Sequence, residues 1–370
     1  MKIEVYSPTI RRKEMDAVLT AMVEEKIGPG ERNRLLIQTA KEQLHFDYAL
    51  ALRSPAVALH LALKALNVRS GQAVIISALS PRYYFQVIDD LRLTPLFCDV
   101  TYDFPCLSRE TIENTIAGKP DGLEVAAVVL HHTLGFLPDA AAIAELGFPV
   151  IEDISQSYGS RLKSGNNNEE AASTDDVKTK KKTNASQPPD SNSQFTGVFC
   201  ILGLEERDIL TSGGGALLFA MNRKDGSLLR NFSAIPDEYC LADINAALAG
   251  VQFKELQRNI EKRRDIARVY AQAGLRTRHK RFIPLASDDE YNNYSFCLVL
   301  EAGLKDVISY ARKKEIIIES AFENTIAGAG MSVNCPVSNS LALRTVMFPL
   351  YPRLRSQDAE RVSRLIMTLP

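Results

Sequence analysis

The sequence has almost no excess charge of either sign, with 44 Lys and Arg residues against 45 Asp and Glu residues. A net charge of -1 gives no reason to expect a polyanion such as nucleic acid as a partner. The 6 cysteines form no CxxC pair, which argues against a zinc knuckle or a disulfide framework and predicts reduced thiols in a cytoplasmic protein. The 5 histidines lack metal-ligand spacing. No apolar run approaches the roughly 18 residues of a membrane span, so none is expected.

The first two thirds of the chain alternate between apolar segments and helical patterns. Strands are expected at 46–52, 74–77, 96–100, 125–130, 148–153 and 217–221, and helices at 9–26, 31–46 and 54–66. Continuous apolar strands separated by helices indicate a mainly parallel sheet that is covered on both faces. The fold class predicted from this pattern is therefore α/β.

The last third predicts a smaller α+β domain. A long helix is expected at 241–273, with Asn259, Arg263 and Arg264 on its polar face. Further elements are expected as strands at 293–300 and 316–318, helices at 304–313 and 357–367, and a turn at 348–352. We therefore predict a large domain at 1–249 and a small domain at 250–370.

Residues 163–194 interrupt the pattern. They contain no aromatic residue and almost no aliphatic one, so they bury too little surface to offset the entropy of ordering. This composition predicts a disordered surface insertion. Its basic run, Lys180 to Lys182, fits either an acidic partner or a solvated run of charge, and base rates favour the solvated run.

Seven short motifs together resemble the DegT/StrS family of sugar-nucleotide aminotransferases. They are IGPG at 27–30, SPAVALHLAL at 54–63, PLFCDV at 95–100, HTLG at 132–135, IEDISQ at 151–156, DINAA at 243–247 and LYP at 350–352. The resemblance implies the aspartate-aminotransferase fold (type I of the pyridoxal-phosphate transferases). It also implies pyridoxal phosphate as cofactor, a keto-sugar nucleotide ligand used in surface-polysaccharide or amino-sugar synthesis, and a homodimer with its site across the two-fold axis.

Three positions match the family's cofactor pocket. Asp153 corresponds to the aspartate that pairs with the pyridine nitrogen, and Gln156 to the glutamine beside the ring. Tyr83, or its neighbour Tyr84, stands where the family offers an aromatic ring for stacking. Their alternatives are ordinary ones: a strand-end aspartate that caps a helix, a surface glutamine, and tyrosines packed in the core or an interface.

The lysine that forms the imine is missing. No lysine occurs between Lys182 and Lys224, and the family's lysine position falls on Glu205 or Arg207, depending on where one gap is placed. A carboxylate forms no imine, and a guanidinium stays protonated at physiological pH.

The phosphate-binding turn is altered as well. After Ser54, the glycine and threonine of the family are replaced by Pro55, which has no N–H, and Ala56, which has no hydroxyl. A serine-capped helix with proline in its first turn explains the same residues. Cys200 replaces a serine of the family, and Glu238 falls near the asparagine of the subunit-bridging loop.

The residues leave three hypotheses. The first is a family member with a vestigial cofactor site at Asp153, Gln156, Ser54, Ala56 and Tyr83, which binds pyridoxal phosphate weakly or not at all and does not transaminate. The second is an active aminotransferase with a non-standard lysine such as Lys180 to Lys182. The third is another enzyme that uses His132, Asp153 and Gln156 as acid, base and orienting group.

Overall fold

The computed structural model describes residues 2–161, 195–232, 234–285, 291–301, 303–332 and 334–370. Its central feature is a seven-stranded sheet of order β1-β7-β6-β5-β4-β2-β3. The strands are β1 Tyr48–Leu52, β2 Ala73–Ser77, β3 Thr94–Cys98, β4 Val125–His131, β5 Val150–Asp153, β6 Phe199–Gly203 and β7 Ala216–Ala220. Only β7 runs against the others, since both of its pairings are antiparallel and the pairings among β2 to β6 are parallel. The predicted α/β class and mainly parallel sheet are confirmed.

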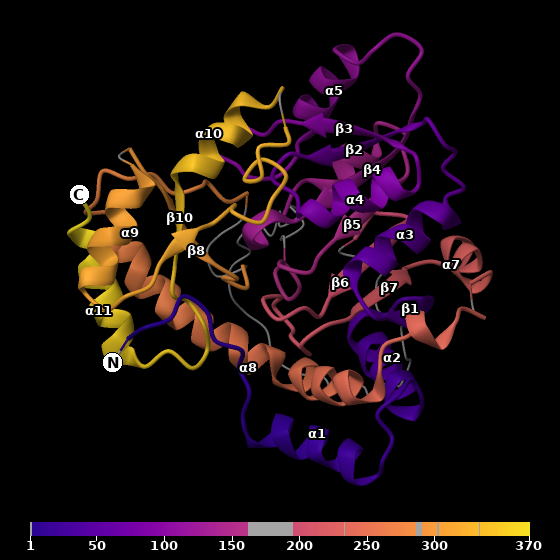
Figure 1. Ribbon diagram of the computed structural model, residues 1–370, viewed down its shortest axis with the longest axis horizontal. Coiled ribbons are helices and arrows are strands. Elements are labelled where there is room, and N and C mark those ends of the chain that lie inside the picture. The colour runs from indigo at the N-terminus through magenta and orange to yellow at the C-terminus, as the bar shows by residue number, and fades with distance from the viewer. Residues whose placement is uncertain (1, 162–194, 233, 286–290, 302, 333) are drawn as a thin grey trace, which may run out of the picture.

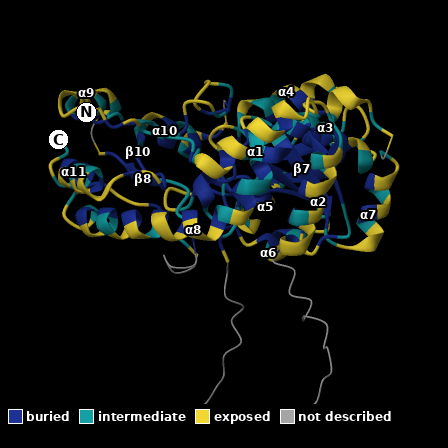
Figure 2. Ribbon diagram, turned by 90° about the horizontal axis from the view of Figure 1, so that it is seen from below, coloured by how far each residue is buried: buried dark blue, intermediate teal, exposed yellow. Residues whose placement is uncertain are grey.

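Helices cover both faces of this sheet (Figures 1 and 2). Successive residues of β1 enter different cores: Leu50 and Leu52 join one cluster, and Ala49 and Ala51 join the other. The first cluster lies under α3 Pro55–Ala65, α4 Arg82–Asp90 and α7 Arg223–Arg230. The second lies under α2 Glu31–Leu44 and α8 Asp243–Gly274. The remaining helices before α8 are α1 Arg12–Val23, α5 Arg109–Ala117 and α6 Ala140–Ala144, with 3-10 turns η1 Thr133–Gly135 and η2 Asp237–Tyr239.

A second, three-stranded antiparallel sheet of order β8-β10-β9 forms the C-terminal part. Its elements are β8 Phe296–Val299, α9 Leu304–Lys313, β9 Glu319–Ser320, α10 Pro336–Arg344, β10 Thr345–Phe348 and α11 Ser356–Met367. The long helix α8 runs from beneath the large sheet to this part (Figure 1). The proposed boundary between 249 and 250 falls inside α8, and the division into two domains stays a prediction.

Several expected elements shift in the structure. The predicted helix at 31–46 ends at Leu44, because His45 takes a left-handed conformation with φ of 54°. The expected strand at 316–318 is wrong: Ile316 makes only an isolated bridge to Ile3, and β9 follows. The sequence also gave no sign of α10 or of β10, the middle strand of the small sheet. The predicted insertion at 163–194 lies almost wholly outside the described residues.

The polar face predicted for α8 is partly wrong. Asn259 and Arg263 are each 6% exposed, since the C-terminal part packs over them. Among the described residues, no helix combines the length and apolarity that crossing a membrane requires.

Candidate functional site

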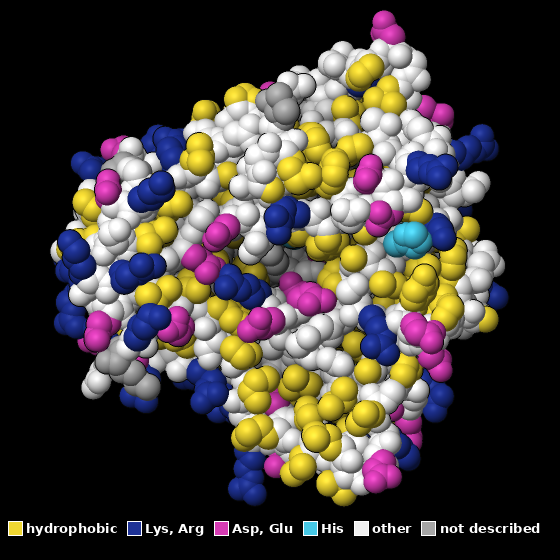
Figure 3. Space-filling model, in the orientation of Figure 1, with side chains coloured by type: hydrophobic (Ala, Val, Ile, Leu, Met, Phe, Trp, Pro, Cys, Tyr) yellow, Lys and Arg dark blue, Asp and Glu magenta, His cyan; other side chains and the backbone are white. Residues whose placement is uncertain are grey.

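A cavity at the ends of the central strands lies between the two sheets. β4, β5 and β6 end at its floor, and the turn after β9 forms its opposite wall; the cavity measures about 230 Å³. Figure 3 shows this face hollowed near its centre, with acidic and basic side chains close by. The polar side chains that line the cavity are His131, Thr133, Gln156, Arg207, Asp208, Tyr294, Glu319, Ser320, Glu323, Asn324 and Thr325. Crevices at the carboxyl ends of parallel strands are the usual ligand sites of α/β proteins.

Asp153, the last residue of β5, is 1% exposed and fully engaged within the protein. Its Oδ2 accepts from the hydroxyl groups of Tyr84 at 2.6 Å and Tyr83 at 3.1 Å, both carried by α4. Its Oδ1 accepts from the backbone N–H of Ser155 at 3.0 Å and from the Ser155 hydroxyl. Burial first, and the charge of Asp153 second, raise the pKa of both tyrosines well above the usual value, so both remain hydrogen-bond donors.

These four donors decide how well Asp153 fits the cofactor role implied by the resemblance. A carboxylate offers about four lone-pair positions. Tyr83, Tyr84 and the two groups of Ser155 use all of them. The Asp153 carboxylate therefore has no acceptor position left for the N–H of a pyridinium ring, and this part of the site does not fit pyridoxal phosphate.

The loop between β6 and β7 directs the side chains of the two candidate lysine positions, Arg207 and Glu205, to different partners. Arg207 makes a two-pronged ion pair with Glu319 of β9, and its guanidinium lies 5.8 Å from the centre of the Tyr6 ring. Glu205 does not line the cavity, and its Oε1 accepts from the backbone N–H of Gly215 at 3.4 Å. Of the two candidates for the lysine position, Arg207 alone lines the cavity, and no lysine of the described residues lines it.

Asp208 is the functional candidate that sequence reasoning missed. It lines the cavity, and its Oδ2 accepts from the backbone N–H of Glu205 at 2.9 Å. Desolvation first, and the charge of Asp153 second, raise its pKa well above the usual range. The only feature of the sequence that could have pointed to Asp208 is its place next to Glu205 and Arg207, the two candidate lysine positions.

The turn expected to bind phosphate is closed by its own helix. The Ser54 hydroxyl accepts from the backbone N–H of Val57 at 3.3 Å, and Pro55 occupies the first position of α3, so the predicted cap is confirmed. Neither Ser54 nor Ala56 lines the cavity. Cys200 is fully buried in the core under α2 and α8. With one backbone N–H lost to proline, no hydroxyl on Ala56, and neither Ser54 nor Ala56 on the cavity wall, these residues do not fit a phosphate group.

Gln156 lines the cavity, held by its Oε1, which accepts from the backbone N–H of Leu134 at 2.7 Å. His132 does not line the cavity and is only 2% exposed. Its Nδ1 lies 2.7 Å from Ser157 Oγ, and its Nε2 lies 3.4 Å from Glu152 Oε2. Its neighbour His131 lines the cavity instead, and burial lowers its pKa to about 4. The hypothesis that used His132 as an acid therefore placed the wrong histidine at the site.

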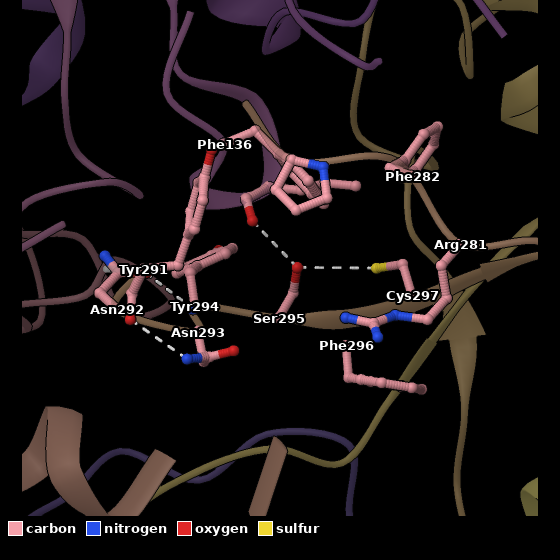
Figure 4. A pocket seen from close by; sticks show the side chains of 13 residues that line it. Phe136, Arg281, Phe282, Tyr291, Asn292, Asn293, Tyr294, Ser295, Phe296 and Cys297 are labelled. Atoms are coloured by element: carbon pink, nitrogen blue, oxygen red, sulfur yellow. Dashed lines mark hydrogen bonds between the residues drawn. The ribbon is translucent and has the colours of Figure 1, made fainter. Parts of the chain in front are cut away.

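A smaller cavity of about 50 Å³ lies behind the segment that carries Tyr294 and Ser295. Aromatic side chains, among them Phe136, Phe282 and Tyr291, surround it (Figure 4). The Ser295 hydroxyl donates to the Leu134 carbonyl at 3.1 Å and fixes this wall. The cavity is too small for a cofactor or a sugar.

The sheet with one reversed strand and a site between the large and small sheets define the aspartate-aminotransferase class of fold. The chain belongs to the DegT/DnrJ/EryC1/StrS aminotransferase family, whose model matches residues 8–179 and 222–367. The unmatched stretch between them holds the loop with Glu205, Arg207 and Asp208. A GDP-perosamine synthase from Escherichia coli O157:H7 is 31% identical over 166 residues, which cover 44% of each chain. The match therefore spans less than half of that relative.

Solved structures confirm the fold. The aminotransferase TlmJ from Streptoalloteichus hindustanus has a TM-score of 0.81 at 20% identity, over 99% of this chain and 98% of that one. The PMP form of the putative sugar aminotransferase Spr1654 from Streptococcus pneumoniae has a TM-score of 0.80 at 16% identity, over 100% of this chain and 97% of that one. An E. coli GDP-4-keto-6-deoxy-D-mannose-3-dehydratase with bound hydrated PLP has a TM-score of 0.78 at 12% identity, over 99% of both chains.

Proposed function

We propose that this protein is a family member that binds a sugar-type ligand in its central cavity and does not transaminate. It would serve as a binding or regulatory partner in nucleotide-sugar metabolism, the ligand class suggested by its relative, the GDP-perosamine synthase. The observation that carries the proposal is the saturated Asp153 carboxylate, whose four acceptor positions are all used inside the protein.

Two further observations support the same reading. The described lining of the cavity includes no lysine, so none of these side chains supplies an imine nitrogen. The volume of about 230 Å³ lies below the roughly 300–1,000 Å³ of typical cofactor and drug-sized pockets, so it suits a sugar ring better than a complete nucleotide sugar.

Addition of pyridoxal phosphate to the purified protein tests the proposal. We expect no imine absorbance near the visible edge, and no pyridoxyl group on any peptide after borohydride reduction. A single modified lysine in the peptide map would overturn the proposal. Modification of Lys180, Lys181 or Lys182, which lie outside the described residues, would establish the alternative of an active aminotransferase with a non-standard lysine.

The proposal includes a homodimer, as the family resemblance implies. α1 exposes an apolar stripe that a second copy would cover: Met15, Leu19 and Met22 are 56%, 58% and 54% exposed. Hydrophobic side chains gather over this helix in Figure 3. Sedimentation equilibrium of the full chain measures the assembly, and a monomer at all concentrations would contradict this part.

A further inference from the structure

Beside the central cavity lies a second, smaller space whose donors resemble an anion site. It measures about 20 Å³ and shares Arg207, Tyr294 and Met347 with the central cavity. Tyr6 and Arg263 complete its polar lining, together with Ser295. A group bound there would be continuous with a ligand in the central cavity.

Arg263 is a buried cation without an anion. Its Nη1 donates to the backbone carbonyls of Tyr294 and Leu350, each at 2.9 Å. No carboxylate lies within ion-pair distance of it among the described residues, and none contributes to its electrostatic surroundings. Burial lowers its pKa to about 10, so it still carries its charge at pH 7. A buried charge without a partner is costly, so an anionic group bound beside Arg263 would offset part of that cost.

The other side chains of this space add donors and little competing charge. Burial raises the pKa of Tyr6 to about 12, so its hydroxyl keeps its proton. Arg207 is already neutralised by Glu319. Two carboxyl groups, Glu206 and Asp208, also act on Tyr6. Glu206 is exposed, so water screens its charge. Burial raises the pKa of Asp208 well above its usual range, which favours its neutral form.

We propose that Arg263, Tyr6 and Tyr294 form a subsite for a carboxylate group, so that the ligand of the central cavity is an acidic sugar. This rests on the proposed function in one respect, that the central cavity takes a sugar-type ligand. A carboxylate fits better than phosphate because the space is small and one uncompensated cation matches one negative charge.

Entry of the carboxylate requires a small movement of Arg207. A space of about 20 Å³ holds one water-sized group, so the guanidinium must turn away from the Tyr6 ring to admit two oxygens. The Arg207 side chain is 48% exposed and held by a surface ion pair. Such pairs contribute little to stability, so the movement is inexpensive.

Isothermal titration calorimetry of the full chain tests the subsite with three probes. D-Glucuronate and D-glucose share a ring and differ in the carboxylate, and inorganic phosphate reports a preference for a dianion. We expect one saturable glucuronate site, with glucose bound at least tenfold more weakly. Equal binding of the two sugars, tighter binding of phosphate, or no glucuronate binding would overturn the subsite.

Variants assign the effect to the named residues. Arg263→Gln should weaken glucuronate binding by about tenfold to a hundredfold, and Tyr6→Phe by about threefold to tenfold. Arg258→Gln, on the same helix but paired with Glu255 at the surface, should leave it unchanged. If circular dichroism shows that Arg263→Gln does not fold, Tyr6→Phe decides, and unchanged affinity in that variant overturns the subsite.

The two proposals fail separately. Formation of an imine with pyridoxal phosphate would refute the proposed function, but glucuronate binding that depends on Arg263 would still support the subsite. Absence of both the imine and glucuronate binding would remove the subsite alone.

Discussion

Removal of the Tyr84 hydroxyl tests whether Asp153 is held as the structure shows. The Tyr84 side chain is fully buried, and its hydroxyl donates to Oδ2 of Asp153 at 2.6 Å. Tyr84→Phe keeps the ring packing and loses one hydrogen bond to a charged group, so the free energy of unfolding should fall by about 1.5–3 kcal/mol. Tyr83→Phe loses a longer bond of 3.1 Å and should cost about 1 kcal/mol.

The double variant gives the sharper number, because both hydroxyls serve the same oxygen. In either single variant Oδ2 keeps one donor, but without both it is buried and unsatisfied. The double variant should therefore cost more than the sum of the single ones, by about 0.5–3 kcal/mol.

Urea unfolding monitored by circular dichroism measures all three variants, with Tyr310→Phe as the control. The Tyr310 hydroxyl donates to Thr368 Oγ1 at 3.0 Å on the exposed surface, so its loss should cost less than about 0.5 kcal/mol. A cost for Tyr84→Phe no greater than that of the control would refute the reasoning. Asp153 would then keep a free position for a ring nitrogen, and the main support for the proposed function would be lost.

Three further predictions concern Asp208, Arg207 and Gly159. The pKa of Asp208 is raised in the folded chain, so above about pH 4 the folded chain holds a proton that the unfolded chain has lost. The free energy of unfolding therefore falls as the pH rises towards the folded pKa, by up to about 1.4 kcal/mol per pH unit. Asp208→Asn should abolish this fall in urea midpoints as the pH is raised above about 4, and an unchanged profile would contradict the assignment. Arg207→Lys should still give no site-specific imine with pyridoxal phosphate, because neither Asp153 nor the turn at Ser54 holds the cofactor with its aldehyde beside the new amine. The substitution should change the free energy of unfolding by less than about 1 kcal/mol. An imine band in this variant would show that the lysine was the only deficit. Gly159→Ala should lower the free energy of unfolding by about 2 kcal/mol or more, since φ is +86° and the new Cβ would overlap with Ile260 Cδ1. Thermal melting checks this, and an unchanged midpoint would argue against the close approach of α8.

Local signals predicted most of the large sheet and the first helices. Apolar runs and helical periodicity act within one or two turns, so the strands before residue 154 were found with shifts of a few residues. β10 and α10 were missed because their residues depend on contacts across the small sheet and with β3. Asp99, at the end of β3, accepts from the backbone N–H of Ser338 at 2.7 Å and so fixes the start of α10 from 239 residues away.

The sequence alone determined that the loop after β6 lacks an imine-forming lysine, because that depends only on which residues are present. It also determined the Ser54 cap, whose donor and acceptor lie three residues apart. Only the tertiary structure decided that His131 and not His132 lines the cavity, that Tyr83 and Tyr84 fill the acceptor positions of Asp153, and that Arg263 is buried. Those outcomes depend on contacts between separate segments, such as His132 with Ser157, Tyr83 with Asp153 and Arg263 with Leu350, which no local pattern records.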